Sequence, residues 1–483
     1  MGRPHNHCGN GGPRSPTTAT GSNQDVATCL PAVAEERSTT VTVVVGAQFG
    51  DEAKGKITDY LAAHARFVVR TGGGPNAGHT IHLPQGKVVL HQLACGVLRA
   101  GVTGVSGPGM VIDPAALESE ILDLRQRDLL KGEVVVSERA HVLLPLHQLE
   151  DAWEEELRTS KNPSGSVGTT RRGIGPAYED RYGRWGIRMV DLVHPADLGQ
   201  RLDLLYATKS FLSNPPPREE LESALRDVGG RLAMYIRPTE PMLWNAISEG
   251  SSVLLEGAQS ALLDVDFGTY PFVTSSHPTA AGALMGSGIP PAELDEVLGV
   301  AKAYATRVGA GPFPTEVGGE MGEFLLREGD ERGATTGRPR RCGWLDLVLL
   351  RYVARLTGFS SLAITKADVL GGLDEIPICV GYRTESGDTI SDYPPTQASE
   401  YAKVTPVYEQ FPGWPRFTAR LRERIRQEGV AAIPGALKRF LRYIGQETRV
   451  PVEYLSFGAD REDTLWLGRG APTHPVTISP WTA

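Results

Sequence analysis

The fold is decided by one stretch near the start of the chain, Thr40-Val41-Thr42-Val43-Val44-Val45, followed by Gly46-Ala47-Gln48-Phe49-Gly50-Asp51-Glu52-Ala53-Lys54-Gly55-Lys56-Ile57. Its first six residues are apolar or β-branched, which is typical of a strand buried on both faces. Residues 50–56 then satisfy the G-x-x-x-x-G-K pattern of a phosphate-binding loop, whose glycines let backbone N–H groups approach phosphate oxygens. A helix that begins at such a loop directs its positive end at the anion.

This loop lacks the Ser or Thr that usually follows Gly-Lys and supplies an oxygen to magnesium, because Ile57 stands there. The metal ligand must come from elsewhere, and Asp51 is the expected one. The alternative is a glycine-rich turn between strand and helix that binds no ligand, since the pattern by itself is short.

Further apolar runs follow outward from this loop, with helical patterns between them. The runs 67–70, 134–136, 253–255 and 362–364 are predicted strands, and 114–130 and 345–356 are predicted helices. Strands that alternate with helices indicate an α/β fold with a large, mostly parallel central sheet flanked by helices.

Composition and patterning set the domain organisation. Residues 1–38 are rich in Gly, Pro, Ser, Thr and Asn without apolar periodicity, so we expect a disordered N-terminal extension. No second boundary is visible after it, so 39–483 is expected to form the catalytic domain.

The whole chain of 483 residues is 40% hydrophobic and 22% charged, which fits a soluble globular protein. Its net charge of −8 excludes a general basic field for nucleic acid, so any anion site must be local. No apolar run approaches the roughly 18 residues of a membrane helix, and the N-terminus lacks a secretory signal. The five cysteines are widely spaced without a CxxC pair, which favours a reducing, cytoplasmic setting.

A second glycine cluster, Gly72-Gly73-Gly74-Pro75-Asn76-Ala77-Gly78-His79-Thr80, follows the predicted strand 67–70. Such a loop can bring a backbone carbonyl and an imidazole close to a nucleotide. Histidine suits acid chemistry near neutral pH, so His79 is a candidate catalytic group. A purely structural or exposed histidine is the alternative.

A third motif, Thr365-Lys366-Ala367-Asp368, follows the predicted strand 362–364. A carboxylate can accept from both the ring N–H and the exocyclic amine of guanine, whereas adenine offers no such pair of donors. The lysine stem can lie across the base plane. Lys-x-Asp is commonplace on protein surfaces, but together with a phosphate loop it indicates GTP.

A fourth motif, Gly333-Ala334-Thr335-Thr336-Gly337-Arg338-Pro339-Arg340-Arg341, combines three arginines with small and hydroxyl residues. Guanidinium groups recognise carboxylates and phosphates through paired hydrogen bonds. The motif therefore predicts a substrate-binding loop, with a solvated basic loop as the alternative.

Taken together, these motifs resemble those of the adenylosuccinate synthetase family. The loop 50–56 is similar to the family's G-D-E-G-K-G-K signature, and the arginine loop and Thr-Lys-x-Asp segment match in order. The resemblance covers 41–465 and includes the segments 76–80, 168–180, 256–259, 268–276 and 306–316.

The resemblance implies a P-loop-like GTP-binding ligase fold. It also implies GTP-dependent ligation of L-aspartate to IMP, giving adenylosuccinate, GDP and phosphate through a 6-phosphoryl-IMP intermediate. Asp51 would remove the N1 proton of IMP and also ligate Mg²⁺, and His79 would assist at the phosphate. Gln259 would stabilise charge on the six-oxygen, and Lys54 would neutralise phosphate charge.

The remaining binding residues are implied in the same way. Around GTP they are Gly50, Glu52, Ala53, Gly55, Lys56, Gly78, Thr80, Arg340, Lys366, Ala367, Asp368, Ser456, Phe457 and Gly458, with the Gly78 carbonyl joining Asp51 on the metal. Around IMP and aspartate they are Asn76, Ala77, Thr170, Arg184, Thr274, Ala334, Thr335, Thr336, Gly337 and Arg338. Arg184 would reach the IMP site of a partner subunit, which implies a homodimer; no nucleic-acid or membrane partner is expected.

Several residues depart from the family pattern: Ala53, Pro75, Ser260, Phe267 and Pro339. The residues at positions 53, 75, 260 and 339 motivate a second hypothesis, a divergent paralogue that acts on another 6-oxopurine nucleotide or resists an inhibitor. A third hypothesis is a GTP-binding regulator without ligase activity. The presence of Asp51, His79 and Gln259 argues against that third hypothesis, because GTP sensing alone does not need them.

Overall fold

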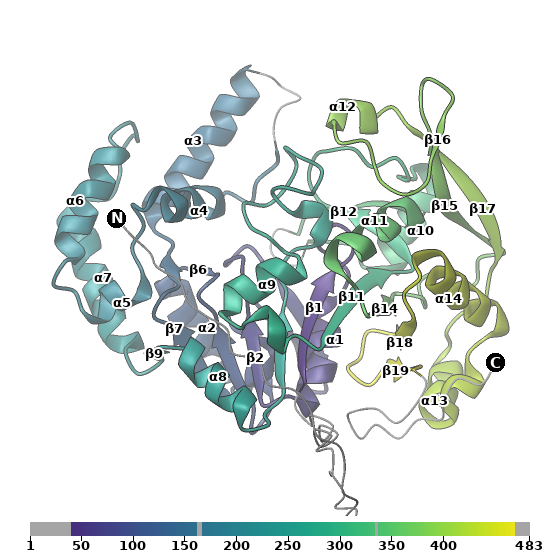
Figure 1. The fold of residues 1–483 in the computed structure, drawn as a ribbon, viewed down its shortest axis with the longest axis horizontal. Helices are drawn as coiled ribbons and strands as arrows, with labels where there is room; N and C mark the ends of the chain where they lie inside the picture. The colour runs from purple at the N-terminus through teal and green to yellow at the C-terminus, as the bar shows by residue number, and fades with distance from the viewer. Residues whose placement is uncertain (1–39, 162–166, 334–336, 469–483) are drawn as a thin grey trace, which may run out of the picture. The chain divides into compact units, whose positions relative to one another are not determined.

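The computed structural model describes residues 40–161, 167–333 and 337–468. The predicted extension over 1–38 lies outside the described residues. β1 (Val41–Gly46) pairs in parallel with β10 (Val253–Glu256) on one side and with β11 (Glu296–Lys302) on the other (Figure 1). It therefore occupies an interior position in the sheet, as its uninterrupted apolar sequence predicts.

The central sheet has ten strands in the order β19-β18-β14-β11-β1-β10-β2-β5-β7-β9. Neighbouring strands run parallel except for β19, which pairs antiparallel with β18 at one edge. Its remaining strands are β2 (Phe67–Arg70), β5 (Thr103–Ser106), β7 (Glu133–Ser137), β9 (Ile236–Arg237), β14 (Ser361–Thr365), β18 (Val452–Ser456) and β19 (Thr464–Trp466). The predicted mostly parallel sheet is confirmed, and each predicted strand is present.

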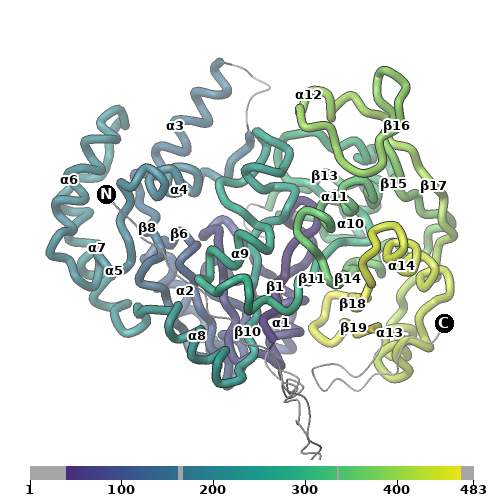
Figure 2. Tube along the Cα trace, in the orientation of Figure 1, coloured from purple at the N-terminus to yellow at the C-terminus, as the bar shows by residue number. Residues whose placement is uncertain are grey.

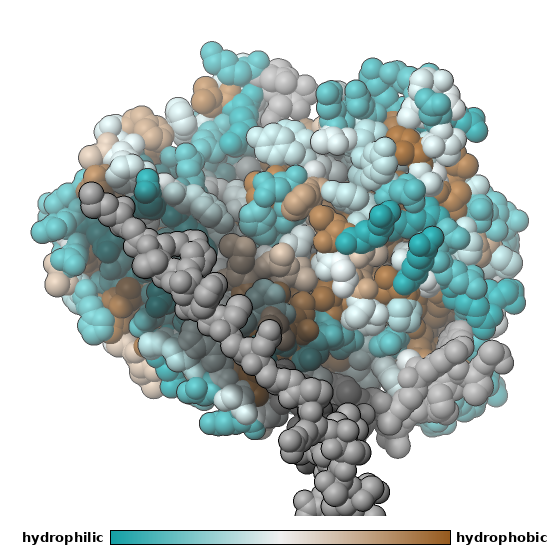
Figure 3. Space-filling view, viewed as in Figure 1, coloured by the Kyte–Doolittle hydropathy of each residue, from teal (hydrophilic) through white to brown (hydrophobic). Residues whose placement is uncertain are grey.

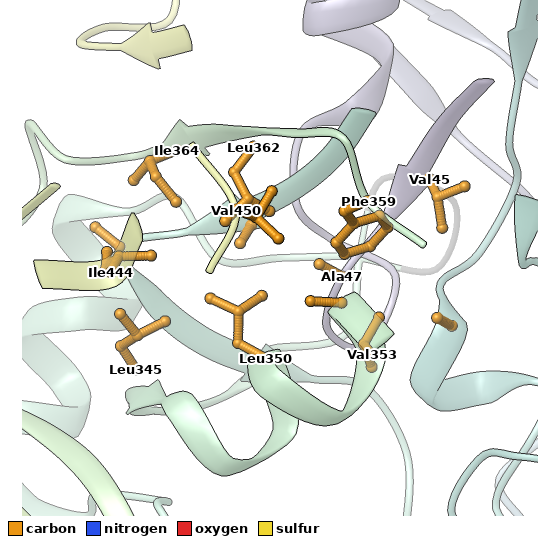
Figure 4. Close-up of a cluster of buried hydrophobic side chains, with 14 of the residues drawn as sticks. Val45, Ala47, Leu345, Leu350, Val353, Phe359, Leu362, Ile364, Ile444 and Val450 are labelled. Atoms are coloured by element: carbon orange, nitrogen blue, oxygen red, sulfur yellow. The ribbon is translucent and has the colours of Figure 1, made fainter. Parts of the chain in front are cut away.

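Both faces of this sheet are buried, because successive side chains of a strand point to opposite faces. Val43 and Val45 join one hydrophobic cluster, whereas Val44 joins another on the opposite face. Figure 4 shows part of the first cluster, where Leu350 and Leu362 point into the same space.

Helices cover both faces and both edges of the sheet. In Figure 1, α5, α6 and α7 lie beyond the β9 edge, and α14 lies beside β18. The α-helices are α1 (Lys54–Leu61), α2 (Pro114–Gln126), α3 (Pro145–Lys161), α4 (Ile174–Gly183), α5 (Met189–Val193), α6 (Leu198–Thr208), α7 (Arg218–Leu232), α8 (Glu240–Ser248), α9 (Ala280–Ser287), α10 (Gly319–Glu328), α11 (Leu347–Thr357), α12 (Ala398–Tyr401), α13 (Ala419–Glu428) and α14 (Gly435–Thr448).

A smaller five-stranded sheet was not predicted. It contains β12 (Tyr304–Arg307), β13 (Arg341–Asp346), β15 (Glu375–Arg383), β16 (Thr389–Ile390) and β17 (Thr405–Pro412). Figure 2 shows β15 and β17 side by side, and the two strands pair antiparallel over most of their length. Two short ladders complete the strands: β3 (His79–Leu83) with β4 (Gly86–Leu90), and β6 (Val111–Ile112) with β8 (His141–Val142).

Two helix boundaries differ from the prediction. The predicted helix 345–356 begins only at Leu347, because Leu345 and Asp346 belong to β13 and the Asp346 carboxylate caps the N-terminus of α11. The predicted helix 114–130 ends at Gln126. The chain turns there because Asp128 adopts a φ of 53° and the Leu129 N–H bonds back to the Leu124 carbonyl.

Each helix in the described part of the chain is too short or too polar to cross a membrane. On the face drawn in Figure 3, hydrophobic residues gather towards the middle and hydrophilic residues predominate around them.

Candidate active site

The candidate site forms where the parallel strands end. Ligand-binding loops of parallel α/β sheets follow the carboxyl ends of the strands, which meet at one edge. The phosphate loop follows β1, Glu256 ends β10 and Lys302 ends β11. Thr365 ends β14 and Ser456 ends β18. Motifs that lie up to 400 residues apart in sequence are thereby brought to one place.

The phosphate loop is organised from within by Glu52. Its Oε1 accepts from the backbone N–H groups of Gln48 (3.0 Å) and Gly50 (2.8 Å), and its Oε2 accepts from Lys54 Nζ at 2.7 Å. Burial opposes the charge of Glu52, but Lys54 and these backbone groups outweigh burial and lower its pKa. The Glu52 side chain therefore holds the loop together and forms an ion pair with Lys54.

Ala53 adopts φ 62° and ψ 34° immediately before α1. This left-handed conformation favours glycine, so the alanine at this position carries backbone strain. The conformation also explains why the chain can turn into the helix within one residue of the loop.

Asp51 lies at the cavity wall beside Arg340. Arg340 Nη2 stands 2.9 Å from Asp51 Oδ1, and Arg340 Nη1 donates to Glu331 Oε2 at 2.6 Å. Burial raises the pKa of Asp51, and the opposing charges of Arg340 and Lys302 only partly offset that effect. A carboxylate with a raised pKa is suited to accept a proton.

His79 is held through Nδ1, which donates to the carboxylate of the fully buried Glu256. Burial and the charge of Arg70 lower the pKa of His79, outweighing Glu256. Its position also depends on Gly55, since a Cβ there would stand 2.8 Å from His79 Cβ. The imidazole is thus fixed in one orientation at the start of β3, with Nε2 left for a ligand.

A cavity of about 340 Å³ gathers many of the predicted nucleotide-binding residues. The predicted residues in its wall are Gly50, Asp51, Ala53, Lys54, Gly55, Lys56, Gly78, His79, Thr80, Arg340, Lys366, Ser456 and Gly458. Gly333 and Thr365, which open two of the predicted motifs, also line it, as do residues that no motif indicated: His82, Lys87, Asp330, Arg332 and Ala459.

The wall of this cavity also contains Lys366, from the predicted guanine motif. Its Nζ donates to the Gly329 carbonyl at 2.6 Å, and the Thr365 hydroxyl donates to the Glu52 carbonyl at 2.9 Å. Thr365 therefore ties this motif to the phosphate loop. Burial raises the pKa of Asp368 against the opposing charges of Lys366 and Arg422.

Gln259 and Asn76, both predicted at the IMP site, face each other. Gln259 Nε2 donates to Asn76 Oδ1 at 3.5 Å, and Gln259 Oε1 is buried without a hydrogen-bond partner among the described residues. Gly73 allows this approach: its φ is 72°, and a Cβ would stand 2.9 Å from Gln259 Oε1.

The other predicted substrate residues lie outside the wall of the 340 Å³ cavity. Arg338 approaches the Thr169 carbonyl, at 3.5 Å, and so lies next to Thr170. The Thr274 N–H donates to the Leu263 carbonyl, and Arg184 is exposed after α4. Ala334, Thr335 and Thr336 fall outside the described residues.

Three buried supporting residues were missed as functional groups: Glu256, Lys302 and Glu331. Glu256 contacts His79, Glu331 contacts Arg340, and Lys302 contacts Glu331. All three side chains are buried and lie outside the cavity wall. Glu256 carried one available signal, because it opens the matched segment Glu256-Gly257-Ala258-Gln259. Lys302 and Glu331 lie in no phosphate or base motif.

Fold and site together define a phosphate-loop enzyme of the parallel α/β type. A sequence model of the family described as adenylosuccinate synthetase matches residues 43–465. The chain belongs to the adenylosuccinate synthetase family, whose members are ligases, and this confirms the predicted family and enzyme class.

Named relatives agree with this assignment. The adenylosuccinate synthetase of Desulforamulus reducens is 45% identical, over 88% of this chain and 98% of the relative. That of Thermomicrobium roseum is 43% identical, over 90% of this chain and 100% of the relative.

Solved structures extend the comparison to the fold. The fully ligated adenylosuccinate synthetase of Plasmodium falciparum has a TM-score of 0.81 and 35% identity, with 88% of this chain and 99% of that chain covered. The succinoaminodeoxyadenylate synthetase of cyanophage S-2L, bound to dGMP and dATP, has a TM-score of 0.58 at 21% identity, which shows a shared fold.

Proposed function

We propose that this chain ligates L-aspartate to IMP at the expense of GTP, giving adenylosuccinate, GDP and phosphate through a 6-phosphoryl-IMP intermediate. The carrying observation is the position of Asp51. Its carboxylate belongs to the phosphate loop and lines the same cavity as His79 and Lys366. A proton-accepting carboxylate, a phosphate-binding loop and a residue of the guanine-recognition motif thereby line one cavity.

In the first half-reaction Asp51 takes the N1 proton of IMP, and the electron pair moves onto the six-oxygen. That oxygen attacks the γ-phosphorus of GTP, so the new O6–P bond forms as the bond to the bridging oxygen of GDP breaks. Gln259 donates to the charge developing on the six-oxygen. His79 donates to the phosphoryl group through Nε2 once that nitrogen carries a proton, and Glu256 at Nδ1 stabilises the resulting imidazolium.

In the second half-reaction the aspartate amine attacks carbon six. The carbon–oxygen bond breaks, and the former six-oxygen leaves as part of inorganic phosphate. Phosphate is a far better leaving group than the carbonyl oxygen of IMP, which is why GTP is consumed. The arginine loop, with Arg338 and Arg340, binds the aspartate carboxylates and aligns the amine.

Magnesium suits the oxygen donors at the γ-phosphate end of this cavity. Asp51 offers a carboxylate and Gly78 a backbone carbonyl, and both residues line the cavity. Hard oxygen ligands of this kind bind Mg²⁺ together with substrate phosphates and water. When bound, the ion would neutralise charge on the β- and γ-phosphates.

Recognition of GTP is assigned to the phosphate loop and to the motif 365–368, whose first two residues line the same cavity. Asp368 accepts from the two N–H donors of guanine, while the Lys366 stem covers the base. Lys56 neutralises phosphate charge from a position fixed by Ser456 and Gly458. On the IMP side we assign Asn76, Thr170 and Thr274.

A homodimer is proposed on the side of α4. Arg184 is exposed at its end, and the neighbouring Tyr182 and Trp185 are 63% and 41% exposed. Exposed aromatic residues beside an arginine are typical of an interface core. Arg184 would then reach the IMP site of the partner subunit.

We also propose that residues 39–483 form the catalytic domain and that the enzyme works in the cytoplasm. Within the described residues, Cys95, Cys342 and Cys379 are free and buried, which suits a reducing compartment.

The test is a complete assay with purified full-length protein, GTP, Mg²⁺, IMP and aspartate, followed by ultraviolet detection of adenylosuccinate. We expect phosphate release only when both IMP and aspartate are present, and product loss on Asp51→Asn. Asp123→Asn, at an exposed helical position, serves as the matched control. Phosphate release without IMP, equal turnover of dGMP, or full activity of Asp51→Asn would contradict the proposal.

A further inference from the structure

Glu331 is a fully buried carboxylate between α10 and β13 that faces three donors. Lys302 Nζ donates to its Oε1 at 2.7 Å, and the Tyr304 hydroxyl donates to the same oxygen. Its Oε2 accepts from Arg340 Nη1 at 2.6 Å. Burial opposes the charge of Glu331, but Lys302, Lys366 and Arg340 outweigh burial and lower its pKa to about 2.

Arg340 is held by Glu331 twice. Besides the contact between side chains, the Arg340 N–H donates to the Glu331 backbone carbonyl at 2.9 Å. Arg332 and Pro339, the next residues along the two segments, form an antiparallel β-bridge, so Glu331 and Arg340 close the base of the arginine loop. The guanidinium then divides its two terminal nitrogens between Glu331 and Asp51.

The other side of Glu331 leads back to the phosphate loop. The side-chain amide of Gln48, two residues before that loop, donates to the Tyr304 carbonyl at 2.9 Å, and Gln48 Oε1 accepts from the Lys302 N–H at 3.0 Å. Lys302 and Tyr304 both contact Glu331. The contacts therefore form a ring that starts at Gln48, just before the phosphate loop, passes through Glu331 and Arg340, and returns to the loop at Asp51.

We propose that Glu331 is a positioning residue for the ligation reaction: it orients the Arg340 guanidinium between Asp51 and the aspartate substrate, and fixes the arginine loop to the phosphate loop. The inference rests on the proposed function. Glu331 is fully buried and is not part of the cavity wall. It acts through Arg340, whose correct placement is needed for the aspartate amine to reach carbon six.

The test replaces the carboxylate by an amide of the same shape. In Glu331→Gln the new NH₂ group faces the Arg340 guanidinium, donor against donor, while the oxygen still accepts from Lys302. We expect kcat to fall about 100-fold, as for a misplaced catalytic group, and KM for aspartate to rise about tenfold. KM for IMP should stay within about twofold, because Asn76, Thr170 and Thr274, which are assigned to IMP binding, are not members of this ring. A purely structural role would not raise KM for aspartate while leaving KM for IMP unchanged.

Two further variants sharpen the result. Glu331→Asp keeps the charge and should recover part of the lost kcat. Glu328→Gln, at the partly exposed end of α10, should resemble the wild type. Amide hydrogen exchange should increase around residues 337–341 in Glu331→Gln and remain unchanged elsewhere.

If Glu331→Gln does not fold, Tyr304→Phe carries the test, since it removes one donor while keeping charge and shape. We expect a smaller rise in KM for aspartate than in Glu331→Gln, again with KM for IMP nearly unchanged. Wild-type kinetics of folded Glu331→Gln or Tyr304→Phe, or an equal rise in both KM values, would overturn the inference. An inactive wild-type protein would instead refute the proposed function.

Discussion

The ammonium group of Lys56 lies 2.7 Å from the hydroxyl of Ser456, a residue 400 positions later in the chain. Lys56 also donates to the carbonyls of Gly458 (2.7 Å) and Asp463 (2.9 Å). The late turn after β18 is thus attached to the first turn of α1. This one lysine links the beginning and the end of the domain at the cavity wall.

The affinity for GDP should depend on the charge of Lys56. Burial lowers the pKa of Lys56 to about 8, partly offset by Asp463 and Asp368. The protonated form attracts phosphate and predominates below pH 8, so the Kd for GDP should rise as the pH increases above 8, by up to about tenfold per unit. Equilibrium fluorescence titration between pH 7 and pH 10 measures this dependence.

Lys56→Arg is the matched control, because arginine remains charged throughout this range. Its GDP affinity should stay level between pH 8 and pH 10. A wild-type profile parallel to that of Lys56→Arg would show that Lys56 does not titrate there.

Gly73→Ala should impair catalysis while leaving nucleotide binding intact. The new Cβ would stand 2.9 Å from Gln259 Oε1 and 3.0 Å from Ala258 Cβ, so the Gln259 side chain must move. We expect kcat to fall about 10- to 100-fold, since the donor to the six-oxygen is displaced. Steady-state kinetics and GDP titration measure the two effects.

Gly101→Ala is the control for the effect of backbone strain alone, without a steric clash. Gly101 also has a positive φ, 79°, but no described atom lies within 4 Å of its Cβ position. It should lose some stability and keep its kcat. Equal kcat values for the two variants would mean that Gln259 is not displaced or is not needed.

Ala53→Gly should stabilise the protein. Ala53 holds a left-handed conformation, which costs an L-residue about 1–2 kcal/mol, and glycine adopts it freely. The greater freedom of glycine in the unfolded chain offsets part of this gain. We therefore expect a net increase of up to about 1 kcal/mol in the free energy of unfolding, measured by urea denaturation.

The same substitution at the other end of α1 should act in the opposite direction. Ala62 has a right-handed φ of −59° and is buried, so Ala62→Gly should destabilise by about 1 kcal/mol. If Ala53→Gly lowered stability as much as Ala62→Gly, the loop would be unstrained.

The central sheet could be predicted from sequence because its strands are buried on both faces. Runs such as 253–255 are apolar throughout, so their pattern does not depend on which neighbour they contact. The smaller sheet escaped prediction because β17 has no buried residue and carries polar residues among its apolar ones. The start of α11 was placed two residues early, because Leu345 is as apolar as the helix that follows it.

The cavity residues could be predicted where ligand binding requires a recognisable motif, as in the loop 50–56 and around Lys366. Its supports were not, since Glu331 meets Lys302 and Arg340 only after β11, β12 and β13 have assembled. A buried carboxylate in a segment without a known motif looks like any other acidic residue in the sequence.

The central claim is that the six-oxygen of the purine captures the γ-phosphoryl group of GTP after Asp51 takes the N1 proton. Incubation of the enzyme with IMP labelled with ¹⁸O at position six, followed by mass analysis of the released phosphate, tests it directly. We predict that each phosphate carries one labelled oxygen, and that Asp51→Asn releases none. Unlabelled phosphate formed alongside adenylosuccinate would contradict the account.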